Sequence, residues 1–174
     1  MLTLKSGLFG LQGRYEESLL IADSVLQRDP EYADAHSSKA YSLLKLGKPK
    51  EALTALNQVR DRRDLYWPET AMAAAIHYEL GQYELAAQMA QKAKTEMTHD
   101  ELSNPNGGAV SLTLIAAEAQ LGHLPRAQRA LADFKAAVPG VQTILAVKKW
   151  IHHGADLAGY EPLFDGLRRA GMTD

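Results

Sequence analysis

The chain has 174 residues, of which 46% are apolar and 23% charged, and its net charge is −2 with no cysteine. This length allows one domain with a sizeable core. The missing cysteine excludes disulfides and thiolate zinc sites, and the small net charge excludes a general attraction to nucleic acid or acidic membranes. No apolar run approaches the ~18 residues that cross a bilayer. We therefore expect a cytoplasmic protein with no cofactor, no metal, and no membrane or nucleic-acid partner.

Glycines recur along the chain at a nearly fixed interval. Gly13, Gly47 and Gly81 lie 34 residues apart, and Gly122 follows 41 residues after Gly81. A helical stretch precedes each glycine and another follows it, so each period contains two helices. Glycine suits the left-handed residue just past a helix end, where a Cβ would clash. The interval predicts four antiparallel helix pairs, at about 1–30, 31–64, 67–98 and 108–138.

Small side chains stand five residues after each of these glycines, at Ser18, Ala52, Ala86 and Ala127. The distance between two packed helices depends on the side chains at their contact. We therefore expect the two helices of each pair to approach most closely at these positions.

Two parts of the chain depart from the interval. Residues 95–108 (TEMTHDELSNPNGG) carry an insertion of seven residues in a turn-rich stretch, where we expect an extended loop. After Pro139, residues 141–153 predict an amphipathic helix, and a last short helix ends near Gly171. Stacked repeats need an atypical end to cover their exposed apolar face. Residues 140–174 are therefore interpreted as a terminal helix pair that acts as a cap.

The phrases GRYEES at Gly13, GKPKEAL at Gly47 and GQYELA at Gly81 resemble the tetratricopeptide repeat, and the resemblance extends from Met1 to about Pro139. It implies an all-α fold, a right-handed superhelix (solenoid) of antiparallel helix pairs with about ten helices. The bulky aromatic residue that the family usually carries in the first helix of a repeat is replaced by His36, Thr70 and Ser111.

The tail resembles a narrower group. Its helix resembles the end of the tetratricopeptide regions attached to bacterial class III adenylate cyclases, and related regions follow some winged-helix transcription regulators. The residues that carry this resemblance are Leu163, Gly166, Leu167, Arg168, Arg169, Ala170 and Gly171. It implies that the chain is a regulatory fragment of a larger protein whose catalytic or DNA-binding part lies elsewhere.

Catalytic chemistry is not indicated. His152 and His153 are adjacent and point about 100° apart on a helix, which does not suit one metal ion. The RDRRD cluster at 60–64 could bind an anion, but a basic helix end with mixed signs is the simpler interpretation. The basic pairs Lys148-Lys149 and Arg168-Arg169 are interpreted as parts of solvent-exposed helix faces. Since neither a phosphate loop nor a nucleophile elbow is present, we expect no enzyme activity.

A binding face is predicted from the register of the resemblance, in which the first helix of each pair lines the concave side. The candidate residues are Ser37, Ser38, Tyr41, Lys45, Met72, Ala75, Tyr78, Glu79, Leu112, Thr113, Ala116 and Gln120. The carboxylate clamp of the family's chaperone-tail binders is missing, because its places hold Ser38, Pro68 and Met72. Tyrosines among small and apolar residues suit an amphipathic segment. Alternatively, Tyr41, Met72 and Tyr78 pack against neighbouring repeats or the chain's own final helix.

The sequence thus predicts a protein–protein interaction scaffold or regulatory module that binds a peptide or helical segment in a concave groove. The alternative is a homo-oligomerisation element that acts through residues 1–12 or through the tail. The partner's identity does not follow from the sequence.

Overall fold

The computed structural model describes residues 2–151 and 160–174, and in these residues it contains eleven helices and no strand. The all-α prediction is therefore confirmed. The helices are α1 (Leu2–Leu11), α2 (Tyr15–Leu26), α3 (Ala33–Lys45), α4 (Pro49–Arg60), α5 (Trp67–Glu79), α6 (Tyr83–Glu96), α7 (His99–Ser103), α8 (Pro105–Gln120), α9 (Leu124–Ala137), α10 (Ile144–Ile151) and α11 (Glu161–Arg169).

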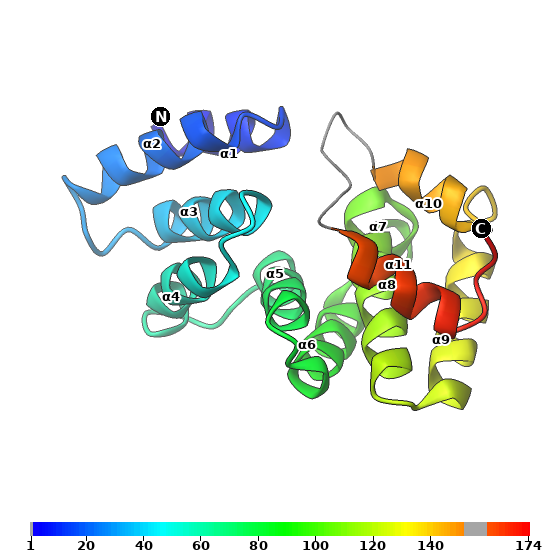
Figure 1. The fold of residues 1–174 in the computed structure, drawn as a ribbon. Helices are drawn as coiled ribbons and strands as arrows, with labels where there is room; N and C mark the ends of the chain where they lie inside the picture. The colour runs from blue at the N-terminus through cyan, green and yellow to red at the C-terminus, as the bar shows by residue number, and fades with distance from the viewer. Residues whose placement is uncertain (1, 152–159) are drawn as a thin grey trace.

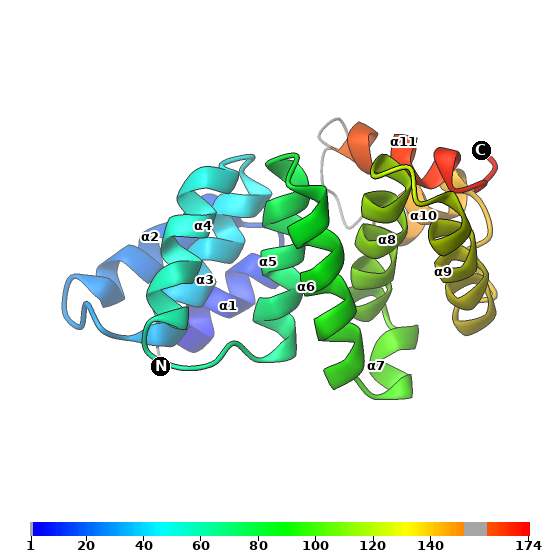
Figure 2. The same ribbon diagram turned by 90° about the horizontal axis from the view of Figure 1, so that it is seen from below.

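The helices pack in sequential pairs, α1 with α2, α3 with α4, α5 with α6 and α8 with α9. Figure 1 shows the pairs in a curved row, with α3, α5 and α8 on its inner side and α4, α6 and α9 on its outer side. Figure 2 shows the same pairs standing side by side. We call the surface formed by α3, α5 and α8 the inner face.

The turn inside each pair is built on the predicted glycine. Gly13, Gly47, Gly81 and Gly122 have φ angles between 70° and 76°. The residue after each glycine donates its backbone N–H to a carbonyl five residues earlier, as Lys48 does to Leu43 at 2.9 Å. This bond satisfies a free carbonyl at the end of the preceding helix. The prediction of a left-handed glycine at each helix end is confirmed.

The predicted small positions are all buried. Ala52, Ala86 and Ala127 are fully buried, and Ser18 is 1% exposed. Around them the core forms two apolar clusters, one from α3 to α5 that includes Leu56 and Ile76, and one from α5 to the C-terminus. The second cluster takes in residues from 74 to 172, so the tail shares the core of the last two helix pairs.

The first helix pair joins the others through buried serines. Ser6 and Ser18 each donate a hydroxyl hydrogen bond to the other's backbone carbonyl, both at 2.9 Å, and Ser42 of α3 donates to Ser18 Oγ at 2.9 Å. All three residues are almost fully buried, so these bonds satisfy polar groups that burial would otherwise make costly.

The expectation of an extended loop at 95–108 is wrong, because the structure has α7 and the first turn of α8 there. Thr98 caps α7: its hydroxyl accepts from the Glu101 backbone at 3.3 Å, while the Glu101 carboxylate accepts from the Thr98 backbone at 2.8 Å. Trp67 Nε1 of α5 donates to Glu101 Oε1 at 3.0 Å and ties α7 to the stack. A capping box is enough to start a helix in a turn-rich stretch.

The tail folds back onto α8. Helix α10 starts at Ile144, whose backbone N–H donates to the Thr173 carbonyl at 2.8 Å, and α11 packs across α8 (Figures 1 and 2). His152 and His153 lie outside the described residues. The division into a repeat region at 1–139 and a cap at 140–174 stays a prediction.

Among the described residues, no helix combines the length and the apolar character that crossing a membrane requires. In the same part of the chain, no three histidine or acidic side chains gather in an arrangement that could hold a metal ion.

The α3–α5 cluster gives a direct test of the core. Leu56 is 2% exposed, and Leu56→Ala should lower the free energy of unfolding by about 2–5 kcal/mol, because it removes buried methyl groups and leaves a cavity. Urea denaturation followed by circular dichroism measures this loss. Leu145 is 57% exposed, so the matched change Leu145→Ala should cost less than about 0.5 kcal/mol. Equal losses in the two variants would contradict this core.

Candidate protein-binding face

The twelve predicted residues all lie on inner helices, in three groups. Helix α3 carries residues 37, 38, 41 and 45, helix α5 carries 72, 75, 78 and 79, and helix α8 carries 112, 113, 116 and 120. The structure separates them into a mostly buried part, formed by the α8 residues and Tyr78, and a part that remains open on α3 and α5.

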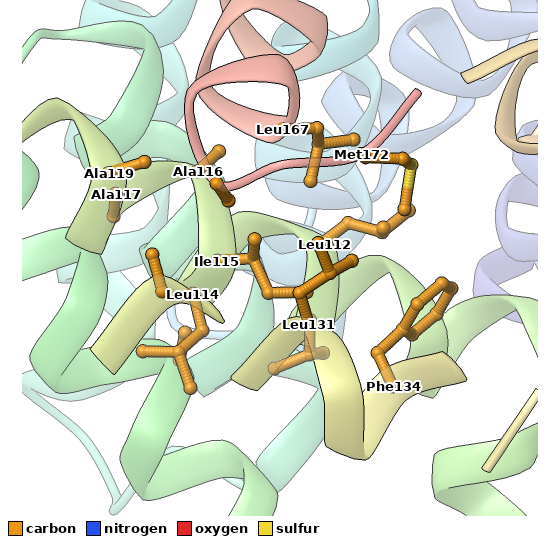
Figure 3. Close-up of a cluster of buried hydrophobic side chains, with 14 of the residues drawn as sticks. Leu112, Leu114, Ile115, Ala116, Ala117, Ala119, Leu131, Phe134, Leu167 and Met172 are labelled. Carbon is orange, nitrogen blue, oxygen red and sulfur yellow. The ribbon is translucent and has the colours of Figure 1, made fainter. Parts of the chain in front are cut away.

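The α8 residues are covered by the chain's own tail. Leu112 and Ala116 are fully buried and Thr113 is 8% exposed. Figure 3 shows Leu112 and Ala116 facing Leu167 of α11 and Met172 of the C-terminal segment. Gln120 Nε2 donates to Asp165 Oδ2 of α11 at 3.2 Å. Leu112, Ala116 and Gln120 therefore face or contact the tail, and only Gln120 of the four α8 residues keeps a partly exposed side chain.

Gly166 sets how closely α11 approaches α8. A Cβ at this position would lie 2.7 Å from the Ala116 Cβ and 2.8 Å from its Cα, distances that real Cβ contacts do not reach. Glycine on one helix and alanine on the other bring the two backbones together. A side chain at position 166 would therefore force α11 and α8 to shift apart.

Tyr78 also serves the tail. It is 4% exposed, its hydroxyl donates to the Pro162 carbonyl at 2.7 Å, and its ring centroid lies 5.2 Å from that of Tyr83. Burial raises the pKa of the Tyr78 phenol, so the group stays protonated and keeps its donor. The sequence left open whether Tyr78 binds a partner or packs within the chain. Its contacts agree with packing against the chain's own final helix.

The other predicted residues of α3 and α5 remain open. Ser37, Ser38, Tyr41, Met72 and Ala75 are each partly exposed. The Tyr41 ring is held from one side, since its centroid lies 6.2 Å from that of Tyr15 in an edge-to-face arrangement. Burial raises the pKa of its phenol. These five residues, which we call the open patch, combine one fixed aromatic ring with small and flexible side chains.

Lys45 lies between the open patch and the tail. Its Nζ donates to the Tyr160 hydroxyl at 3.0 Å and lies 5.6 Å from the ring centroids of both Tyr41 and Tyr160. Desolvation alone would lower the pKa of Lys45, but the phenol groups outweigh it and raise the pKa. Glu79 lies nearby and its side chain is exposed. Partial desolvation raises the pKa of its carboxyl group, and the positive charge of Lys45 acts in the opposite direction. Together these residues form a polar rim beside the open patch.

Two arginines of the cluster at 60–64 pair with carboxylates of the chain. Arg63 holds the Glu69 carboxylate with two hydrogen bonds of 2.7 Å, and Arg62 pairs with Glu31 at 2.8 Å. Ser37 donates to the same Glu69 carboxylate. Burial would raise the pKa of Glu69, but the hydrogen bonds from Arg63, Ser37 and the Tyr66 backbone lower it. An anion site at Arg63 is thus already filled by a carboxylate of the chain.

Glu69 was not predicted from the sequence, because Arg63 was considered only together with its acidic neighbours Asp61 and Asp64. Three basic residues of the tail also have acidic partners. Lys148 pairs with Glu161 at 3.4 Å, Arg168 with Asp174 at 2.9 Å, and Arg169 with Asp165 at 2.8 Å. Such exposed pairs contribute little stability and agree with solvated faces.

The Glu69 pair predicts a pH-dependent stability. The lowered pKa stabilises the fold above the ordinary value of 4.5, and this contribution is lost as the pH falls through the folded-state pKa. Glu69→Gln should cost about 1–3 kcal/mol at pH 7, and its difference from the wild type should shrink below pH 4.5. Urea denaturation over a pH series measures both. Glu31→Gln, at a 77% exposed side chain, is the control, and an equal effect there would contradict the assignment.

Comparison with known proteins gives a sequence match over part of the chain and a similar fold over nearly all of it. A family model for the tetratricopeptide repeat matches residues 11–76. The crystal structure of YrrB, described as a TPR protein with an unusual peptide-binding site, superposes with a TM-score of 0.65 at 17% identity, covering 97% of this chain and 82% of that one. PilF of Pseudomonas aeruginosa superposes with a TM-score of 0.67 at 16% identity, covering 99% of this chain and 76% of that one.

Comparison with curated protein sequences gives no match. Identities of 16–17% show a shared fold and carry no functional residues from one chain to the other. Residues 11–76 therefore match the tetratricopeptide repeat by sequence, and the chain has the all-α fold of tetratricopeptide repeat proteins.

Proposed function

We propose that this chain is an interaction module that binds a peptide or helical segment of another protein on the open patch of the inner face. The observation that carries the proposal is the difference between the two parts of that face. On α8 three of the four predicted residues are buried, whereas on α3 and α5 all but Tyr78 remain at least partly exposed.

The chemistry of the open patch suits a segment with one apolar side. Tyr41 presents a ring that Tyr15 already holds in place, so a partner loses little conformational freedom when it packs there. The small side chains Ser38 and Ala75 allow a helix to lie close, and Met72 adapts to irregular surfaces. Lys45 and Glu79 supply the polar rim that interfaces carry around an apolar centre.

Two further lines support this proposal. The similar fold of YrrB occurs in a protein described as having a peptide-binding site. The tail resemblance to regions attached to adenylate cyclases makes a regulatory module, linked to an effector domain in the same protein, the specific form of the proposal. A cytoplasmic location belongs to the same proposal and rests on the absence of cysteine.

Tyr41 should dominate binding. With a peptide selected from a displayed library, Tyr41→Ala should weaken binding about ten-fold or more, because buried aromatic anchors carry much of the energy of an interface. Calorimetry measures the affinity, and circular dichroism checks that the helical signal is kept. Tyr32 is 38% exposed and lies outside the open patch, so Tyr32→Ala is the control. The proposal fails if Tyr41→Ala binds the peptide as tightly as the wild type does.

Self-association through the first helix pair is the second candidate. Leu8 of α1 is 53% exposed and Leu20 of α2 is 70% exposed, which leaves two large apolar side chains on this pair without cover. The tail is a weaker route, since Phe164, Leu167 and Met172 are buried within the chain. A second copy would cover Leu8 and Leu20.

Light scattering over a concentration series tests self-association. If the first helix pair mediates it, the wild type should increase in mass with concentration, and Leu20→Glu should remain monomeric, because a charge cannot be buried there without a partner. Leu124→Glu changes a leucine of α9 that is 42% exposed and serves as the control. A wild type that is monomeric at every concentration removes this candidate.

A further inference from the structure

The C-terminal segment touches three successive inner helices. Tyr160 accepts a hydrogen bond from Lys45 of α3, the Pro162 carbonyl accepts one from Tyr78 of α5, and Asp165 accepts one from Gln120 of α8. In a stack of repeats each unit normally contacts only its neighbours. This segment packs on α8 and reaches the last turns of α3 and α5 through single hydrogen bonds, so it lies on the inner face as a ligand would.

Helix α11 uses one side for this contact. Phe164 and Leu167 are fully buried, Ala170 is 1% exposed, and Met172 just beyond the helix is 2% exposed. The opposite side carries Glu161, Arg168 and Arg169, which are exposed. An amphipathic helix laid by its apolar side onto a helical surface is a common mode of peptide recognition.

From these contacts we infer that the inner face of α8 is a helix-binding site that the chain fills with its own α11. The helix that fits is an amphipathic one with an aromatic residue, a glycine two positions later and a leucine directly after the glycine. The site has no room for a side chain opposite Ala116. This inference rests on the proposed function in one respect: it confines an external partner to the open patch, because the α8 part of the inner face is occupied.

The covalent link decides which helix occupies the site. A segment in the same chain acts at an effective concentration on the order of millimolar, so a free helix of equal affinity does not compete at micromolar concentration. An external helix therefore gains access to α8 only when the fit of α11 is impaired. Changing α11 alone leaves the receptor residues Leu112 and Ala116 intact.

The test uses the full chain and a fluorescein-labelled peptide with the sequence of residues 160–174. Gly166→Leu in the chain places a side chain against Ala116 and should release α11, so the labelled peptide should then bind by fluorescence anisotropy. The wild type should bind it at least about ten-fold more weakly. Gly140→Leu is the matched control, because a Cβ at Gly140 meets no atom within 4 Å. This variant should behave as the wild type does.

A labelled peptide that itself carries the Gly166→Leu change should not bind any of the chains. Equal binding of the native peptide to the wild type and to the Gly166→Leu chain would overturn the inference. So would a Gly166→Leu chain that keeps its helical signal and binds no peptide.

A second variant guards against misfolding. Phe164→Ala with Leu167→Ala weakens α11 without adding volume and should also bind the native peptide. Loss of the helical signal in both variants would overturn the inference, since α11 would then be part of the core on which the helix pairs depend. The outcome is independent of the open patch: if Tyr41→Ala leaves partner binding unchanged, the proposed function fails while peptide exchange on α8 is unaffected.

Discussion

Close backbone contact at small side chains is the constraint on which this structure depends. Ala52, Ala86 and Ala127 let the two helices of a pair approach one another, and each of them is fully buried. Gly166 and Ala116 apply the same constraint to α11 and α8. Where a small residue stands, helices can meet, and where it is replaced they must separate. The same local chemistry therefore builds the stack and attaches the tail to it.

This attachment divides the inner face into two parts with different properties. On α8, a row of residues that would otherwise be open to solvent forms part of the core with Phe164 and Leu167. On α3 and α5, the open patch retains exposed surface around Tyr41. Lys45 marks the border, because it contacts both the Tyr41 ring and the tail residue Tyr160. A partner bound at the open patch would therefore also lie beside the C-terminal segment.

The regular part of the fold could be predicted from the sequence because its signals are local. A glycine with φ near 70°, followed after five residues by a small side chain, defines each helix pair without reference to distant residues. The short helix α7 was missed although its signal is also local. The capping box of Thr98 and Glu101 was not recognised, because the residues around it have a turn-rich composition.

The candidate site could be predicted only in part, because the deciding contacts join residues far apart in the chain. The register placed Leu112 and Ala116 on the inner face, but it could not show that residues about 50 positions later cover them. Gly166 belonged to a motif in the sequence, and its role as the contact with Ala116 depends on the three-dimensional packing. For the same reason, Tyr41 and Tyr78, which looked equivalent, differ in exposure.

Hydrogen exchange followed by mass spectrometry tests the central claim most directly, namely that α11 is docked on α8. In the full chain, the backbone amides of residues 164–170 should exchange as slowly as those of residues 112–119, because both helices belong to one buried cluster. Exchange of residues 164–170 at the rate of an unprotected segment, with residues 112–119 still protected, would contradict the docking of the tail and the division of the inner face that follows from it.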